Sequence, residues 1–360
     1  MNSKCKSAAV ADHVCLTDKL LTWYDTCGRE LLWRRDTSLY PVWVSEVMLQ
    51  QTRVEAVEPY YRRFLSRFPD METLAYAAEE EVLSVWQGLG YYSRARNLQA
   101  GVREALERYG GELPKVRQEV ESLTGVGSYT AGALLSIVYG QAEPAVDGNV
   151  LRVFSRLFCL KQPVTSAAGK QAVTALVRAV IPVDRPGDFN QAVMDLGATI
   201  CGRTPRCQAC PLQAECAAFK AGCQHDLPVK ARKSEPVPVA MTAGIIRDRE
   251  HRYYVRKRPK GGLLAGMWEF PTVEAGSEPE AALRASFSAK GQSIDSLSEW
   301  RSLRHVFSHR VWEVQVYRGL GSGWDHEQRE NGCWLTLAEL NTLPLGKPHQ
   351  MMVDWLAKEA

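Results

Sequence analysis

Two carboxyl groups in apolar surroundings are the residues of this chain best suited to acid–base chemistry. Glu46 lies among Trp43, Val47 and Leu49 in a stretch with helical spacing. Apolar surroundings disfavour the charged form of a carboxyl group and raise its pKa, which suits a general acid. Asp147 stands in a second apolar setting further along the chain. The alternative for Glu46 is an ordinary helical glutamate whose side chain points to solvent.

Four of the ten cysteines have the spacing of a metal site. They are Cys201, Cys207, Cys210 and Cys216, with gaps of five, two and five residues. Four thiolates at such a spacing bind either Zn²⁺ or an iron–sulfur cluster. Disulfides are not expected, because the first residues carry no apolar export signal. The grouping therefore predicts a metal centre.

A glycine-rich hairpin between two helices is a second candidate for ligand binding. In Leu123–Gly127, Gly125 and Gly127 allow backbone angles that a Cβ would penalise. A helix begins at Ser128, and the free amides at its start would hold a phosphate. Such contacts grip a nucleic-acid backbone without reading the bases. The alternative is a turn whose glycines serve packing alone.

The hairpin followed by Asp147 resembles the helix-hairpin-helix DNA glycosylases, and the stretch Trp43–Arg53 resembles the signature of the adenine DNA glycosylases, the MutY family. The resemblance implies that Glu46 protonates adenine while Asp147 stabilises the positive charge that develops on the sugar. One protonated and one ionised carboxyl group is also what glycoside hydrolysis requires. By the same resemblance, Tyr129 and Asn149 lie beside the two carboxyl groups and support the cationic transition state and the aspartate.

Position 129 distinguishes two kinds of glycosylase. In the related endonuclease III, a lysine follows Gly-Val-Gly-x and attacks the sugar, whereas this chain has Tyr129. A phenol cannot form the Schiff base that an amine forms. We therefore expect a monofunctional glycosylase that excises adenine opposite 8-oxoguanine or guanine. The alternatives are an endonuclease III-like pyrimidine glycosylase and lyase, and a DNA-lesion binding protein without catalysis.

The resemblance also implies which residues contact DNA or the flipped base. Gln50 and Gln51 would enter the duplex between Leu49 and Thr52, and Tyr91 would intercalate beside the flipped nucleotide. The base pocket would be lined by Arg29, Trp33 and Arg34, and the DNA backbone would be held by Gly125, Gly127 and Ser128. The alternatives are a buried tryptophan at a helix end and aromatic side chains packed between helices.

The same family carries a [4Fe–4S] cluster just after its catalytic domain, which favours this cofactor for the four grouped cysteines. The first gap here is five residues, where the family usually has six, and this departure bears on the shape of the loop and on the type of cluster. Cys159 and Cys223 are expected to be bystanders.

The stretch Lys260–Pro271 resembles the start of a Nudix domain. A Nudix hydrolase needs an Arg-Glu-x-x-Glu-Glu helix to hold Mg²⁺, and the helix expected here has no acidic cluster. Recognition is therefore expected in place of phosphohydrolysis. The family reads 8-oxoguanine with a Phe-Ser-His loop, which here is Phe307, Ser308 and His309. A serine hydroxyl both donates and accepts, so it can tell oxidised guanine from guanine.

The candidate residues lie in two halves of the chain that differ in their expected secondary structure. Apolar residues recur at helical spacing from Asp18 to about Lys220, without a convincing strand. We expect an all-α helix-hairpin-helix domain with an iron–sulfur loop at 1–225, a linker at 226–238, and a small α+β Nudix-like domain at 239–360. In the last part, strands are expected at 239–246, 251–257 and 311–317, and helices at 280–290, 337–342 and 349–358.

Composition limits how such a chain can bind DNA. The 360 residues carry a net charge of only +3, so binding must rest on local patches. The chain is 45% hydrophobic and 24% charged, as in globular proteins, and no apolar run is long enough for a membrane span. We expect a monomer that binds duplex DNA with an 8-oxoguanine·adenine mispair, in the bacterial cytoplasm at the nucleoid.

Overall fold

The computed structural model describes residues 3–229, 235–259, 261–276, 278–289, 292–322 and 332–359, without the side chains of 3–14 and 322. The chain divides into two compact units, Met1–Ala77 with Arg94–Arg232 and Ala78–Ser93 with Lys233–Ala360. Residues 230–234 of the expected linker lie outside the described residues, as do Lys260 of the Nudix-like stretch and Lys290 of one expected helix. The domain boundaries expected from the sequence stay a prediction.

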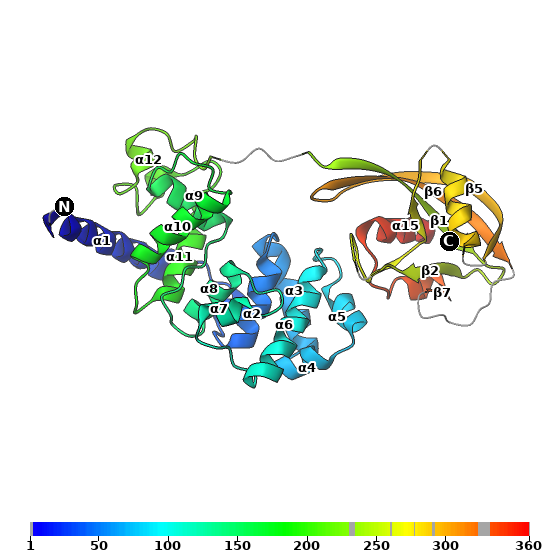
Figure 1. Ribbon diagram of the computed structural model, residues 1–360, viewed down its shortest axis with the longest axis horizontal. Helices are drawn as coiled ribbons and strands as arrows, with labels where there is room; N and C mark the ends of the chain where they lie inside the picture. The colour runs from blue at the N-terminus through cyan, green and yellow to red at the C-terminus, as the bar shows by residue number, and fades with distance from the viewer. Residues whose placement is uncertain are drawn as a thin grey trace. The chain divides into compact units, whose positions relative to one another are not determined.

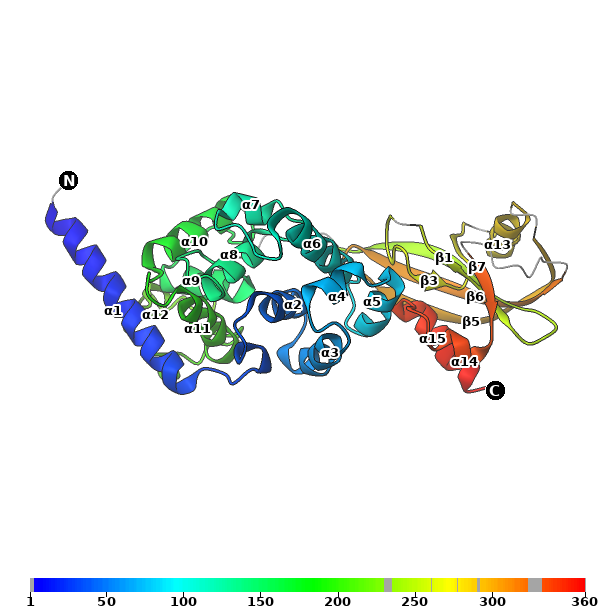
Figure 2. The ribbon, with the colours of Figure 1, turned by 90° about the horizontal axis from the view of Figure 1, so that it is seen from below.

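The described residues of the first unit form helices joined by loops, without a strand, as the apolar spacing predicted (Figures 1 and 2). Its α-helices are α1 (Ser3–Cys27), α2 (Leu39–Leu49), α3 (Val54–Arg67), α4 (Met71–Tyr76), α6 (Ser93–Tyr109), α7 (Arg117–Glu121), α8 (Ser128–Ile137), α9 (Gly148–Leu157), α10 (Ala167–Val180), α11 (Pro186–Thr199) and α12 (Ala217–Lys220). Short 3-10 helices, η1 (Leu32–Arg34) and η2 (Cys207–Ala209), accompany them.

Helix α8 occupies the middle of this unit. It packs against α2 on one side and against α11 on the other, and α11 also packs against α9 and α1. Figures 1 and 2 show α8 between the group α2, α3, α4 and α6 and the group α1, α9, α10, α11 and α12. The core around α11 includes Leu20, Phe154, Phe189 and Leu196, each at most 1% exposed. Residues at the start of α8 can therefore reach elements of both groups.

The second unit combines helices with a mixed β-sheet, which confirms the class expected for the second half (Figure 1). Its elements are α5 (Glu79–Trp86), β1 (Val237–Arg247), β2 (Tyr253–Lys257), β3 (Trp268–Glu269), β4 (Thr272–Glu274), α13 (Pro279–Ser288), β5 (Ser293–Val306), β6 (Arg310–Ser322), β7 (Gly332–Leu335), α14 (Leu337–Leu340) and α15 (Lys347–Ala357). The strand order is β3-β2-β1-β6-β5, with β1 and β6 parallel and β4 and β7 paired to β1 and β2.

Strand β5 is the long element that the sequence did not predict. It lies at the end of the strand order, pairs antiparallel with β6, and most of its side chains are exposed. Because an edge strand with few buried side chains lacks apolar alternation, its sequence carries little strand signal. Strand β6 also runs well beyond the expected 311–317. Together the two strands form a long hairpin whose turn is Phe307–His309.

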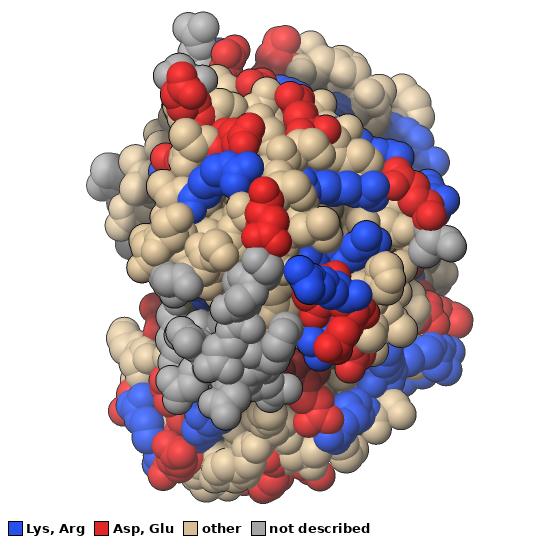
Figure 3. All heavy atoms as spheres, turned by 90° about the vertical axis from the view of Figure 1, so that its right-hand side faces the viewer, with Lys and Arg blue, Asp and Glu red and all other residues tan. Residues whose placement is uncertain are grey.

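Charged side chains of both signs mix on the surface of the molecule. On the face drawn in Figure 3, Lys and Arg are interspersed with Asp and Glu. In the second unit, for example, Glu359 pairs with both Arg301 and Arg318. The visible face carries no broad field of one sign, in agreement with the low net charge. Among the helices of the described residues, none has the length and apolarity needed to cross a membrane.

Candidate active site

Glu46 is buried in α2, where it meets Tyr129 from α8. Its apolar neighbours on the helix include Trp43 and Val47, which are 1% and 4% exposed, and Glu46 itself is 7% exposed. The Tyr129 hydroxyl donates a hydrogen bond to Glu46 Oε2. Burial raises the pKa of Glu46 to about 7, and the negative charge of Asp147 adds to the rise. The side chain does not point to solvent, and it can hold a proton near neutral pH.

Tyr129 is a hydrogen-bond donor that keeps its proton. Burial raises the pKa of its phenol well above the usual value, and the charge of Glu46 adds to this. The hydroxyl also lies 3.8 Å from Met194 Sδ. A neutral phenol at this place can orient the Glu46 carboxyl group, but it cannot form a Schiff base with a sugar.

Asp147 caps the N-terminus of α9. Its Oδ1 accepts hydrogen bonds of 2.8 Å from the backbone N–H groups of Asn149 and Val150, and Asn149 Nδ2 donates to Oδ2 at 2.7 Å. Burial raises the pKa of Asp147, while these bonds and the charge of Arg152 oppose the rise. Three donors and the positive end of a helix stabilise a carboxylate. The site thus combines a carboxyl group suited to carry a proton with one suited to stay ionised.

Asp195 is a functional candidate that the sequence reasoning missed. It lies on α11 with no exposed surface, and it accepts from Arg29 N and Nε and from Arg34 Nη1 and Nη2, each at 2.8 Å. Burial alone would raise the pKa of Asp195, but the hydrogen bonds and charge of Arg34, with the hydrogen bonds of Arg29, bring the pKa below its usual value. The sequence could have indicated this residue, because Asp195 is the single acidic residue within the apolar run Ala192–Leu196, as Glu46 is within its own apolar stretch.

The three residues expected to line the base pocket come from one short segment that Asp195 fixes. Arg29 and Arg34 are both held by its carboxylate. The positive charge of Arg34 lowers the pKa of Glu46, so this guanidinium acts on the acid. Trp33 is buried and packs edge-on against Tyr61, with ring centroids 5.8 Å apart. Trp33 is thus held by packing, and its place in the base pocket stays a prediction, while the charge of Arg34 reaches Glu46.

The segment Leu49–Thr52 ends α2 in a tight, strained turn. Gln51 is exposed with a φ of +57°, a backbone conformation that side-chain-bearing residues rarely adopt. Gln50 Nε2 donates to Thr130 Oγ1 at 3.3 Å. Arg94 holds the turn by donating to Gln50 O at 2.6 Å and Thr52 Oγ1 at 3.2 Å. Strain of this kind gathers at functional sites, so the turn supports a role for Gln51 outside the fold itself.

The two hairpin glycines have different tasks. Gly125 has a φ of +79°, and a Cβ added there would lie 2.5 Å from Asn97 Cβ, so packing against α6 requires this glycine. Gly127 precedes α8 as its N-cap, and a Cβ added there would meet nothing within 4 Å. Thr124 is bonded to Glu104 of α6 through its N–H at 2.9 Å. The packing alternative accounts for Gly125, while the space beside Gly127 and Ser128 is open to a ligand.

In the second unit, the structure brings Tyr91 close to the expected recognition loop. Tyr91 is 50% exposed with a φ of +49°, and its hydroxyl lies 3.4 Å from Ser308 Oγ. Phe307 anchors the loop by packing edge-on against Trp312, with ring centroids 5.0 Å apart. Ser308 and His309 are exposed at the tip. A loop held by a half-buried ring presents two polar side chains to solvent.

The four grouped cysteines line one small cavity of about 30 Å³ together with Arg156. Their thiols are free, and Arg156 Nη1 donates to Cys201 Sγ at 3.3 Å. Within the described parts of the chain, no three His, Cys, Asp or Glu side chains are placed to hold a single metal ion. In a [4Fe–4S] cluster each cysteine binds a different iron, so four thiols around one cavity fit such a cluster. Despite the five-residue first gap, Cys207 lines the same cavity as the other three cysteines.

Comparisons with known proteins agree with this geometry. Residues 44–178 match the HhH-GPD superfamily of base excision DNA repair proteins, and residues 242–355 match the NUDIX domain. An adenine DNA glycosylase from Rattus norvegicus is 35% identical over 86% of this chain and 71% of its own length. One from Buchnera aphidicola subsp. Schizaphis graminum is 30% identical over 93% of this chain and 96% of its own length.

Solved structures show the same architecture for more than half of the chain. A thermostable thymine-DNA glycosylase is 26% identical with a TM-score of 0.53, over 59% of this chain and 99% of that one. A non-covalent endonuclease III–DNA complex is 24% identical with a TM-score of 0.50, over 62% of this chain and 99% of that one. The latter likeness is evidence for the fold.

Proposed function

This chain belongs to the adenine DNA glycosylases, enzymes that hydrolyse N-glycosyl bonds in base excision repair, and from this premise we propose how its residues release adenine and which mispair it serves. The substrate of the proposal is duplex DNA in which adenine lies opposite 8-oxoguanine or guanine. The observation that carries the proposal is the pair of unlike carboxyl groups, Glu46 with a pKa of about 7 and Asp147 held by three donors.

The reaction begins with a flipped adenine, because its glycosidic bond is out of reach inside a duplex. Flipping costs a few kcal/mol and costs less at a mispair. In this proposal Gln51 enters the duplex, which its exposed side chain supports. Tyr91, which is also exposed, intercalates beside the flipped nucleotide. The open helix start at Gly127 and Ser128 grips the DNA backbone through its amide groups.

Glu46 then gives its proton to N7 of adenine as the bond to the sugar lengthens. The Tyr129 hydroxyl keeps the carboxyl group oriented throughout. The sugar acquires positive charge, and the Asp147 carboxylate stabilises it while Asn149 holds that carboxylate in place. Water completes the reaction and leaves an abasic site. Since residue 129 is a tyrosine, no covalent Schiff base forms and the strand stays intact.

The second unit reads the base opposite adenine. Guanine presents N7 as an acceptor, whereas 8-oxoguanine presents an N7–H donor beside its O8 acceptor. Ser308 at the exposed loop tip can accept from that N–H and donate to that oxygen. The neighbouring hydroxyl of Tyr91 supports the same contact, because it lies within reach of Ser308 Oγ.

A [4Fe–4S] cluster held by Cys201, Cys207, Cys210 and Cys216 completes the proposed enzyme. Its four iron–thiolate bonds would tie the loop that follows α11 into one body. Arg156 supports this assignment, because it bonds to Cys201 Sγ and to the carbonyl groups of Gly202 and Leu227 around the loop. Iron and sulfide analysis of the purified protein, with its absorption spectrum, tests the cofactor directly.

The decisive experiment measures single-turnover release of adenine from duplexes with adenine opposite 8-oxoguanine, guanine or thymine. The proposal predicts fast release opposite 8-oxoguanine, slower release opposite guanine and little opposite thymine. Borohydride trapping of a covalent protein–DNA adduct would establish a lyase instead. Tight binding of the mispair without any free adenine would establish a lesion-binding protein and remove the acid role from Glu46.

A further inference from the structure

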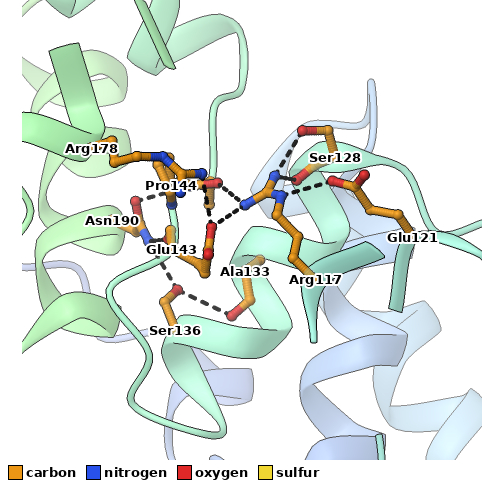
Figure 4. A network of polar contacts seen from close by, with 10 residues as sticks. Arg117, Glu121, Ser128, Ala133, Ser136, Glu143, Pro144, Arg178 and Asn190 are labelled. Carbon is orange, nitrogen blue, oxygen red and sulfur yellow. Dashed lines mark hydrogen bonds and ion pairs between the residues drawn. The ribbon is translucent and has the colours of Figure 1, made fainter. Parts of the chain in front are cut away.

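We propose that Arg117 is a positioning residue that fixes the two catalytic carboxyl groups relative to each other, an inference that rests on the proposed function. Arg117 is the first residue of α7, and its side chain is only 13% exposed. Figure 4 shows its guanidinium between the start of α8 and the segment that leads to α9. These are the two segments that carry Tyr129 and Asp147.

One branch of the guanidinium holds the hairpin. Arg117 Nη2 donates to Ser128 O at 2.6 Å and to Ser128 Oγ at 2.8 Å. Ser128 is the first residue of α8 and immediately precedes Tyr129, whose hydroxyl is bonded to Glu46. A shift of Ser128 would therefore displace the phenol that orients the acid.

The other branch holds the segment before Asp147. Arg117 Nη1 donates to Glu143 Oε2 at 2.6 Å and to Pro144 O at 3.4 Å. From α11, the buried Asn190 binds the same segment, donating to Glu143 O at 2.9 Å and accepting from Ala145 N at 3.2 Å (Figure 4). The segment Glu143–Ala145 is thus held at both sides, two residues before Asp147.

The backbone of the segment Glu143–Ala145 packs directly against α8. A Cβ added at Gly132 would lie 2.0 Å from Pro144 O, so the helix rests directly on that carbonyl group. Arg117 then joins the segment to the helix start by side-chain bonds. Because a planar guanidinium presents its donors in a fixed fork, the two branches hold Ser128 and Glu143 at a set separation.

The ion pairs around Arg117 supply matched controls. Glu121 accepts from Arg117 Nε at 2.8 Å within α7, and Arg178 on α10 binds the same Glu143 oxygen at 3.1 Å (Figure 4). Loss of either ion pair leaves the bonds of Arg117 to Ser128 and to Glu143 in place. Arg178→Met and Glu121→Gln therefore remove charge from the same network without separating the hairpin from the segment before Asp147.

The experiment compares Arg117→Met and Arg117→Lys with those two controls in the full-length enzyme. Single-turnover adenine release is measured at saturating enzyme, and the Kd is measured with a duplex that carries a non-hydrolysable adenine analogue opposite 8-oxoguanine. Arg117→Met is expected to slow release by about 10-fold or more while Kd changes by less than about 3-fold, since small misplacements of catalytic groups cost this much. Arg117→Lys keeps the positive charge but lacks the planar guanidinium, so its rate of adenine release should stay low. The release rates of both control variants should remain within about 2-fold of the wild-type rate.

Several results would overturn the inference. A weakened Kd with an unchanged release rate would make Arg117 a phosphate-binding charge. Equal slowing in Arg178→Met would assign the effect to the ion-pair network and not to the fork. If Arg117→Met does not fold, Glu143→Ala removes the side-chain acceptor of the second branch, and an unchanged release rate there contradicts the inference. Absence of adenine release from the wild type would instead refute the proposed function, so the two failures are distinguishable.

Discussion

The Tyr129 hydroxyl donates to Glu46 Oε2 inside the apolar contact of α8 with α2, although the two residues lie 83 positions apart in the chain. The bond opposes the effect of burial on the acid: burial raises the pKa of Glu46 to about 7, and the hydrogen bond from Tyr129 limits that rise. The relationship sets the pH range in which Glu46 can act as a proton donor.

The first prediction concerns the pH dependence of adenine release. Because the protonated form of Glu46 is the active one, the single-turnover rate should be highest at acidic pH and fall as pH rises through about 7. In Tyr129→Phe the bond that lowers the pKa is lost, so this decline should move to higher pH while the maximal rate falls. A pH–rate profile from pH 5 to 9 measures both. An unchanged midpoint in the phenylalanine variant would contradict the assigned coupling.

The second prediction is that Glu46→Gln inactivates the enzyme and yet stabilises it at alkaline pH. The folded-state pKa of about 7 exceeds the ordinary value of 4.5, so the folded wild type retains a proton that the unfolded chain releases. Wild-type stability should therefore fall as pH rises from 4.5 through 7, whereas the glutamine does not titrate. The variant should be more stable at pH 8 by roughly 1–3 kcal/mol. Urea unfolding at pH 5 and pH 8 checks this; equal stability differences at both values would refute it.

The third prediction separates catalysis from capping at Asp147. Asparagine is as good an N-cap as aspartate, so Asp147→Asn should keep the start of α9 and the stability of the fold. It removes the negative charge, and adenine release should drop by about 100-fold or more. Thermal unfolding and single-turnover kinetics on the same preparation decide the matter. Near-normal turnover would exclude Asp147 from the charge-stabilising role.

The fourth prediction is that Asp195→Asn destabilises the first unit. Arg29 and Arg34 lose the buried charge that compensates them, and breaking a buried pair in this way costs about 3–5 kcal/mol. Arg185→Met, which breaks pairs with the partly exposed Asp25 and Asp188, is the control and should cost at most about 1 kcal/mol. Denaturant unfolding compares them. Similar losses in the free energy of unfolding in the two variants would show that the buried ion pairs of Asp195 stabilise the fold no more than exposed ones do.

The fifth prediction concerns the base opposite adenine. Ser308→Ala should slow adenine release opposite 8-oxoguanine by about 5- to 10-fold, because one or two hydrogen bonds to the lesion are lost. Release opposite guanine should change little. The ratio of the two single-turnover rates is the measurement, and an unaltered ratio in Ser308→Ala would place lesion recognition elsewhere.

The sequence by itself determined the local features of this protein. The helical spacing of the first half, the two hairpin glycines before Ser128 and the grouped cysteines each depend on neighbours in the chain, where backbone propensity and ligand spacing act directly. The apolar settings of Glu46 and Asp147 could be read in the same way. The tyrosine at position 129 also excluded an amine nucleophile there without any coordinates.

Only the tertiary structure decided which of these residues meet. Asp195 and Arg34 are 161 positions apart and Arg117 and Glu143 are 26 apart, and their contacts depend on how α11, α8 and α7 pack. The packing of the Trp33 ring against Tyr61, 28 positions away, likewise depends on the fold, and strand β5 arose at a sheet edge where few of its side chains are buried. Helix packing and sheet pairing bring together residues distant in the chain, and local propensity carries no information on such contacts.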